Sequence, residues 1–219
     1  MRLTERLTRL KEWTYSTVCE GRSLKAPGEK MNIGEIVYRE PKCYLGWAPA
    51  RRDQGGLVFE TPDSVCPGII IMPNQAYTKR MEEKRFDRYN HVSRPKELGQ
   101  QLSVSVLFGI YEPGIRLPGF AESAAAGGLG LDLDLMAEGT EQGLYTLLDW
   151  MDDFQTALIR EKMIPHTDLF VDEEQITYGL YVDQNYVVDR RPLYYGFVNV
   201  LFGCYANEGV NPPIDNYLV

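Results

Sequence analysis

The chain has 219 residues, of which 44% are hydrophobic and 25% are charged. This is the composition of a folded globular protein long enough to bury a core, and it argues against disorder over most of the length. The formal net charge of -8 at pH 7 lowers the expectation of a nucleic-acid-binding protein, because such proteins usually carry a basic face.

The first predicted element is an amphipathic helix over residues 3–18. Its apolar stripe repeats at spacings of three and four residues, as one face of a helix requires, while charged side chains lie on the other side. The residues of the stripe are Leu3, Leu7, Leu10, Thr14 and Val18. Because this stripe is narrow, we expect the helix to lie on the outside of a sheet.

Residues 24–67 carry turn residues at short intervals. They occur in the stretches KAPGEK, REPK, WAPARRDQGG and ETPD, with short β-like pieces between them. This pattern predicts an irregular insertion or a set of small hairpins, with the charged and glycine-rich stretch ARRDQGG at a tip.

Two strands are predicted next. Three successive isoleucines between two prolines indicate a short strand at Ile69–Met72 that is buried on both faces. The stretch Leu102–Tyr111 alternates between apolar and small or polar residues, which is typical of a strand with one buried face. Between these strands, residues 79–96 hold seven cations and three carboxylates but no apolar stripe. We interpret that segment as a solvated excursion or an arm that meets a partner.

A loop and then the strongest helix follow. Residues 119–140 are rich in alanine and glycine and predict a flexible loop. From Glu141 to Met163, apolar residues with helical spacing predict a helix with Thr140 as its N-cap and Pro165 just beyond its end. The side chains expected to be buried against the sheet are Leu147, Met151, Phe154 and Leu158.

The last predicted strands are Ile176–Val182 and Leu193–Tyr205. The second has two apolar faces, so we expect it to be covered on both sides, by helices of its own chain or by a neighbouring subunit. The order of elements predicts one domain over residues 1–219 of the α+β class. It would be a mainly antiparallel sheet with helices packed on one face, plus the irregular β-rich insertion at 24–67.

The candidate reactive groups have simpler structural explanations. His166 has no accompanying nucleophile motif, the pair Asp132 and Asp134 lacks a calcium-loop pattern, and the aspartates within residues 149–153 fit a solvated helix face. The four cysteines form no CxxC pair, and only two histidines could help them to bind zinc. The sequence therefore predicts no catalytic, cofactor-binding or metal site, and a protein that is not an enzyme.

A membrane is not an expected partner. No apolar run approaches the roughly 20 residues that span a bilayer. The N-terminal stretch lacks the continuous apolar core of a signal peptide, so synthesis and residence in a cytosol are the default expectation.

The stretch LSVSVLFGIYEPG follows an N-terminal helix, a proline-led apolar strand and a charged excursion. This order of elements resembles that of the tail terminator (tail completion) proteins of long-tailed bacteriophages and related phage-like particles. The stretch GLYTLLDWMDDFQTALIREKMI is similar to the family's next helix, and RRPLYYGFVNVLFGCY is similar to its closing strand. The resemblance covers about residues 67–205 and, weakly, the first helix. The insertion and the Ala/Gly loop are not features of the family.

The resemblance implies a structural protein without enzymatic activity that assembles as a ring, usually of six copies. Such a ring caps the finished tail tube, fixes its length and presents a surface to the head connector. The implied partners are further copies of the chain, the tail tube protein and the head-tail connector or other neck proteins. No cofactor is implied, and nucleic acid enters only as the genome passing through the channel. The implied locations are the tail or neck of the virion and, during assembly, the host cytoplasm.

Two other functions stay open at this point. Another neck or tail component, such as a head-tail connector, a stopper or a tube protein, would share the composition and the ring assembly. A small-molecule enzyme with a site made of scattered residues is the second alternative. A defined oligomer without bound ligand would favour the structural class over the enzyme.

Two groups of residues are predicted to contact subunits or partners. Cations gathered in an acidic protein suit a docking surface for an acidic rim, and aromatic residues of the last strand suit contact between subunits. The cations are Lys79, Arg80, Lys84, Arg85, Arg88, Arg190 and Arg191, and the aromatic residues are Phe197 and Phe202.

Overall fold

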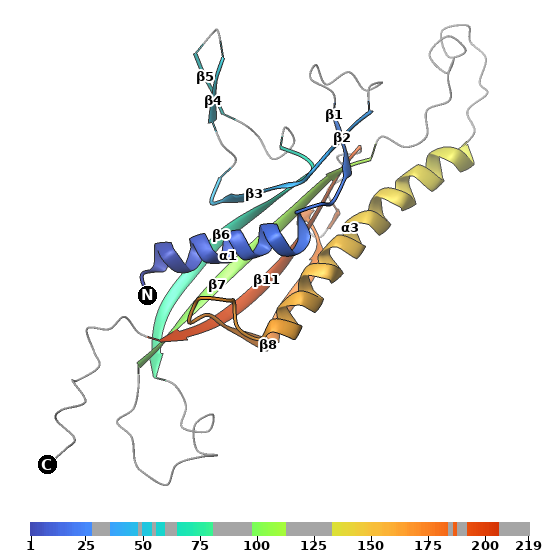
Figure 1. Cartoon of the computed structure of the whole chain (residues 1–219). Helices are drawn as coiled ribbons and strands as arrows, with labels where there is room; N and C mark the ends of the chain where they lie inside the picture. Colours follow the sequence, from blue (N-terminus) through green and yellow to red (C-terminus); the bar gives the residue numbers. More distant parts are fainter. Residues whose placement is uncertain are drawn as a thin grey trace, which may run out of the picture.

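The computed structural model describes residues 1–27, 36–47, 50–53, 56–59, 65–80, 98–112, 133–183, 186–187 and 192–205. Its centre is a five-stranded sheet with the strand order β3-β6-β7-β11-β8 (Figure 1). These strands are β3 Lys42–Leu45, β6 Gly68–Arg80, β7 Leu98–Tyr111, β8 Phe170–Leu180 and β11 Leu193–Tyr205. All neighbours are antiparallel except β3 and β6, which are parallel.

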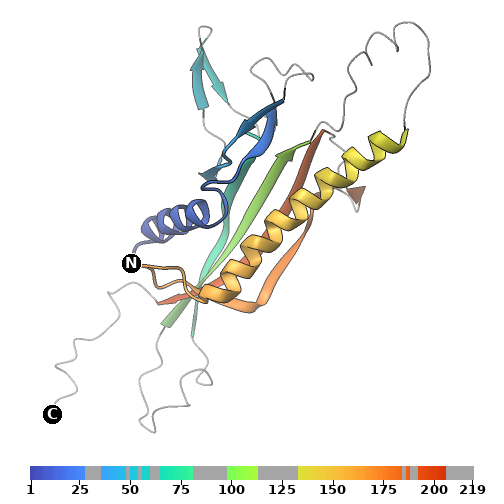
Figure 2. The same ribbon diagram turned by 45° about the vertical axis from the view of Figure 1, so that its right-hand side comes forward.

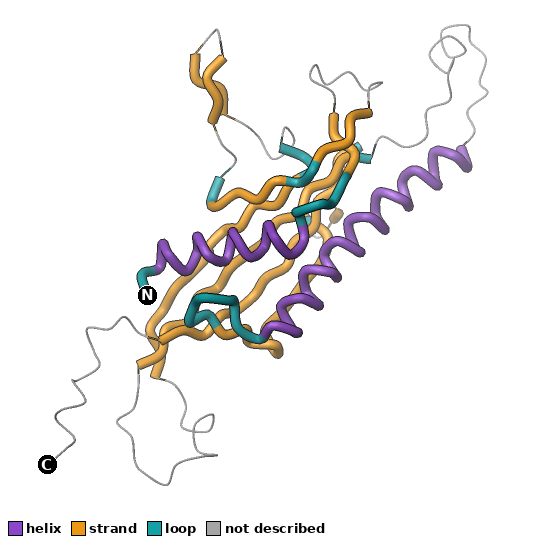
Figure 3. The backbone as a smooth tube through the Cα atoms, in the orientation of Figure 1, coloured by secondary structure: helices purple, strands orange, loops and turns teal. Residues whose placement is uncertain are grey.

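Two helices lie on the same face of this sheet (Figures 1 and 2). Helix α1 spans Leu3–Val18, as predicted, and the long helix α3 spans Leu133–Glu161. The tube view shows α1 crossing the sheet at an angle and α3 running along it (Figure 3). The α+β class with helices packed on one face of a mainly antiparallel sheet is therefore confirmed.

The core lies between the helices and the sheet, because each element turns one apolar face inward. The alternate residues of β7 from Leu102 to Ile110 are buried, and so are Val198, Val200 and Phe202 of β11. On α3 the four side chains predicted to be buried are at most 1% exposed. The Trp150 indole N–H donates to the Val18 carbonyl oxygen at 2.7 Å, which joins the two helices.

An aromatic group fills the middle of this core. The ring centroids of Phe108 and Trp150 lie 5.2 Å apart with the rings at 82°, and those of Phe108 and Phe154 lie 5.6 Å apart at 62°. Edge-to-face contacts of this kind add stabilisation beyond the burial of the rings. Phe108 therefore links β7 to α3 through two aromatic contacts.

An ion pair between a buried arginine and a partly exposed aspartate fixes α1 to the loop after α3. The Arg6 side chain is fully buried, and its guanidinium binds the Asp168 carboxylate through Nε to Oδ1 at 2.8 Å and Nη2 to Oδ2 at 2.5 Å. Burial alone would raise the pKa of Asp168, but the hydrogen bond and charge of Arg6 outweigh it and hold this pKa below its ordinary value. The bidentate geometry makes this a strong, directional contact.

The segment predicted as an insertion contains three separate pieces. Strands β1 (Leu24–Pro27) and β2 (Ile36–Arg39) form one hairpin, and β4 (Ala50–Asp53) and β5 (Gly56–Phe59) form another. The predicted tip ARRDQGG spans the connection between β4 and β5. Strand β3, however, lies within the same segment and belongs to the central sheet, so the segment is not wholly an addition to the fold.

Several predicted boundaries are wrong. Helix α3 begins at Leu133, so the end of the predicted 119–140 loop is helical and Thr140 is an interior residue, not an N-cap. Strand β6 continues past Pro73 to Arg80 through a register shift between Pro73 and Gln75. Strand β8 begins at Phe170, six residues before the predicted start, and stops at Leu180. Two-residue strands β9 (Val182–Asp183) and β10 (Tyr186–Val187) follow it.

Candidate interaction surface

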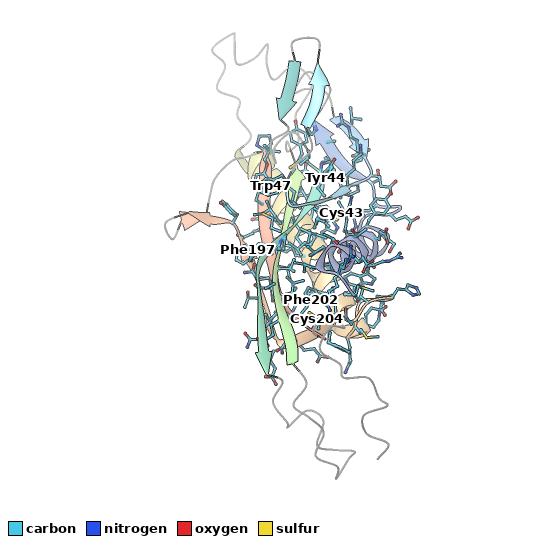
Figure 4. The ribbon with its side chains drawn as sticks, turned by 90° about the vertical axis from the view of Figure 1, so that its left-hand side faces the viewer. Cys43, Tyr44, Trp47, Phe197, Phe202 and Cys204 are labelled. Carbon is cyan, nitrogen blue, oxygen red and sulfur yellow. The ribbon has the colours of Figure 1, made fainter. Side chains whose placement is uncertain are left out.

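Among the described residues, α1 and α3 both lie on one face of the central sheet, and no described helix covers the other face, which we call the uncovered face. On β11, Tyr195, Phe197 and Asn199 point to this face, while the buried Val198 and Phe202 point to the helices. Figure 4 labels Phe197 on the side away from α1 and Phe202 on the side toward it. The last strand is thus core on one side and partly exposed on the other.

A shallow hollow of about 730 Å³ lies on the uncovered face. Apolar and aromatic side chains form most of it, and the hydroxyl of the lining residue Tyr195 lies 3.6 Å from the Cys66 sulfur. The lining residues are Met72, Asn74, Ser105, Leu107, Gly179, Leu180, Tyr181, Tyr195, Phe197 and Asn199. An exposed apolar hollow surrounded by polar groups is typical of a surface that contacts another molecule.

A row of hydrogen-bonded side chains crosses four strands on this face, and three of its four residues line the hollow. The Asn74 amide donates to Ser105 Oγ at 2.6 Å, the Ser105 hydroxyl donates to Asn199 Oδ1 at 2.5 Å, and the Asn199 amide donates to Thr177 Oγ1 at 3.4 Å. We call these four residues the polar ladder. None carries a charge, so the ladder gives the uncovered face hydrogen-bonding capacity without attracting or repelling ions.

Replacing Asn199 by alanine is expected to lower the free energy of unfolding by about 1 kcal/mol, because two ladder bonds are lost while Ser105 and Thr177 can bind water instead. Urea denaturation followed by circular dichroism measures this loss. The matched variant is Asn74→Ala, at the exposed end of the ladder, where only one bond is lost. Equal losses in the two variants would show that the ladder does not act as a connected row.

The sheet has two open edges in the part of the chain that the structure describes. On its outer side, β8 is bonded to the segment after α3 at Phe170 and Val171, where Phe170 bridges Met163 and the Val171 amide donates to the Lys162 carbonyl at 2.9 Å. From Asp172 to Leu180, no described strand pairs with that side. At the opposite edge, β3 pairs with β6 only from Gly68 to Ile71, so the rest of β6 has no neighbour there among the described strands. Open edges present unpaired backbone groups to solvent or to another chain.

The residues predicted to make contacts fall in different places. Phe197 lies on the uncovered face, and its contact with a neighbour stays a prediction. Phe202 is 0% exposed in the core, so its predicted place at an interface is wrong. Lys79 and Arg80 are the last two residues of β6. The cations at positions 84, 85, 88, 190 and 191 lie outside the described residues.

Several of the groups considered in the sequence lie in ordinary structural surroundings, whereas Asp132 and the side chain of Asp134 lie outside the described part of the chain. Burial raises the pKa of both Cys19 and Cys43 to about 12, which keeps these thiols protonated at neutral pH. Asp153 forms an ion pair with Arg22 on the surface. Within the described ranges, no group of three or more His, Cys, Asp or Glu side chains could hold a metal ion. No helix in those ranges is long and apolar enough to cross a bilayer.

The polar ladder was not predicted. The alternation of β7 does place Ser105 opposite the buried face, and Asn199 interrupts an apolar run, so each was visible by itself as a polar residue on the other side of its strand. Only the register, which pairs Asn199 with both Ser105 and Thr177, shows that they form a row.

Comparison with known proteins adds no relative to this description. A scan against protein-family models finds no match to the chain, and a search of curated proteins finds no significant similarity.

Proposed function

We propose that this chain is a structural subunit of a phage or phage-like tail, which forms a ring on the end of the tail tube and joins it to the head connector. The observation that supports the proposal most is the sheet with helices on one face, an uncovered opposite face and two different open edges. A closed ring needs two unlike surfaces on each subunit, because neighbours related by rotation meet head to tail. The two edges of this sheet are such surfaces.

The uncovered face fits the same role. Its hollow offers apolar area for contact with the rim of the tube or the connector, and the polar ladder keeps the rest of the face compatible with water. The resemblance of residues 67–205 to tail terminator proteins is the reason for proposing a tail ring and not another kind of ring assembly.

Deleting this gene from the gene cluster of its particle tests the proposal. We expect tail tubes of uncontrolled length that do not join heads, seen by electron microscopy, with normal tails restored by the parent gene on a plasmid. Tails of normal length joined to heads in the deletion strain would contradict the proposal. Heads and tubes of normal length that fail only to join would indicate a connector or stopper instead.

A further inference from the structure

The two open edges of the sheet are complementary in strand direction. Strand β8 is antiparallel to β11, β11 to β7 and β7 to β6, so β8 and β6 run in opposite directions. A second copy placed beside β8 with its open β6 edge, without being turned over, therefore presents an antiparallel partner. Antiparallel addition of a strand to an open edge is a common way in which chains associate.

The regular part of the β8 edge has outward backbone groups available. The Tyr181 amide donates to the Tyr195 carbonyl at 3.0 Å, so this residue faces β11. Hydrogen-bonded and non-hydrogen-bonded pairs alternate along an antiparallel ladder. The amides and carbonyls of Ile176, Tyr178 and Leu180 therefore point away from β11, where the described part of the chain has no further strand.

The other half of the β8 edge is an acidic bulge. The pairing passes from Ile176 with Val200 directly to Val171 with Phe202, so the four residues Asp172–Gln175 stand opposite Leu201 alone. Three of these four residues are carboxylates. Among the described residues, Glu173 forms an ion pair with Lys162 at 3.6 Å, and both side chains are too exposed for this pair to hold Glu173 firmly.

The open part of β6 has a matching layout. It begins at Met72, where β3 no longer covers the strand, and it ends with Lys79 and Arg80. Near its start, this edge has Pro73, which has no amide to donate, and a register shift between Pro73 and Gln75. After that irregularity it offers backbone groups, and it ends with the two cations. Read from its C-terminal end, β8 offers backbone groups first and carboxylates last.

A single shift of the neighbouring copy along the strands aligns the backbone groups of the two edges and also brings their opposite charges together. Tyr77 of β6 and Phe170 of β8 lie in the same row of the sheet, through Gln101 and Gly203. A neighbour shifted along the strands by about four residues, or roughly 13 Å, sets Ile176–Leu180 against the open part of β6 and the bulge against Lys79 and Arg80. Strand tilt in a closed barrel of sheets imposes a stagger of this kind.

We propose that β8 of one copy pairs antiparallel with the open part of β6 of the next copy, starting where β3 ends, and that the acidic bulge fixes the register against Lys79 and Arg80. This inference rests on the proposed ring and names the surfaces that close it. The pairing covers both open edges in every copy of the ring, and β3 stops β8 from sliding further along β6.

Charge reversal on each edge tests the proposal. The acidic-edge variant carries Glu173→Lys and Glu174→Lys, and the basic-edge variant carries Lys79→Glu and Arg80→Glu. Each should keep the circular dichroism spectrum of the parent but associate at least tenfold more weakly in analytical ultracentrifugation at low salt. An equimolar mixture should associate like the parent, because each variant then meets the opposite charge on its neighbour. A matched control, Asp149→Lys with Asp152→Lys on the exposed side of α3, should associate normally.

The backbone pairing is tested separately at Tyr178. Its side chain is 58% exposed and its amide points outward, so Tyr178→Pro removes one intermolecular hydrogen bond without breaking the pairing with β11. We expect Tyr178→Pro to weaken association and Tyr178→Ala to preserve it. Equal association of the two variants would overturn strand pairing.

The outcomes separate this inference from the proposed function. A mixture of the charge-reversed variants that fails to associate, or a parent chain that stays monomeric at every concentration, would overturn the interface. Rescue by mixing, combined with normal tails in the gene-deletion strain, would support the interface and reject the tail function. Tails of uncontrolled length in the deletion strain, combined with no rescue by mixing, would support the tail function and reject the interface.

Discussion

Replacing Phe108 by alanine is expected to lower the free energy of unfolding by about 4 kcal/mol, as a large core aromatic cut to alanine usually does. The side chain is 0% exposed and contacts the rings of both Trp150 and Phe154. Its removal takes away buried apolar area and leaves a cavity between β7 and α3 that the rigid helix cannot fill. Urea denaturation followed by tryptophan fluorescence measures the loss.

Leu107→Ala is the matched control, because Leu107 is the adjacent residue of β7 and points to the uncovered face. Because the Leu107 side chain is partly exposed, shortening it should lower the free energy of unfolding by only about 1 kcal/mol. Similar losses for Phe108→Ala and Leu107→Ala would mean that the two faces of the sheet are equally covered in solution. That result at low protein concentration would contradict the layer arrangement described for the single chain.

Replacing Asp168 by alanine is expected to lower the free energy of unfolding by about 3 kcal/mol. This is the lower end for breaking a buried ion pair, because Asp168 itself is 20% exposed. The reason is the guanidinium of Arg6, which is fully buried and would lose its bidentate partner. The matched control is Asp153→Ala, which breaks the more exposed pair with Arg22 and should cost about 0.5 kcal/mol. Equal losses would show that Arg6 finds water or another acceptor when Asp168 is removed.

The same pair predicts a dependence on pH. Because the pKa of Asp168 is lower in the folded chain than in the unfolded chain, its contribution to stability is present above the ordinary aspartate pKa of about 4. It is lost as the pH falls from there through the lower pKa of the folded state. The difference in unfolding free energy between the parent and Asp168→Ala should therefore be constant from pH 7 to pH 5 and shrink below pH 4. A difference that stays constant below pH 4 would contradict this assignment.

Much of the helix-facing side of the molecule could be predicted from sequence. Apolar periodicity is a local property of the sequence, and it predicted the bounds of α1 and β11. It also predicted which side chains of α3 are buried, namely Leu147, Met151, Phe154 and Leu158. Where the pattern was weak, the boundaries were wrong. The polar bulge Asp172–Gln175 interrupts the alternation of β8, so the sequence pattern did not indicate that the strand begins before it. The alanine- and glycine-rich composition before residue 141 predicted a loop where the first turns of α3 lie.

The candidate interface could be predicted only in part. The charges of Lys79, Arg80, Glu173 and Glu174 are visible in the sequence, but they lie more than 90 positions apart, and nothing local indicates that they lie at opposite edges of one sheet. Phe202 was misplaced for a related reason. Both faces of β11 are apolar in sequence, and only the position of α3 decides which of them is core.

By itself, the sequence determined the class of the fold, most of its regular elements and the side chains that fill its core, because these depend on periodicity within about 20 residues. The tertiary structure alone decided the strand order, the parallel place of β3, the row formed by Ser105 and Asn199 and the two open edges. These depend on pairing between segments far apart in the chain. Such pairing is set by the packing of the whole sheet under the helices, and short-range patterns do not carry it.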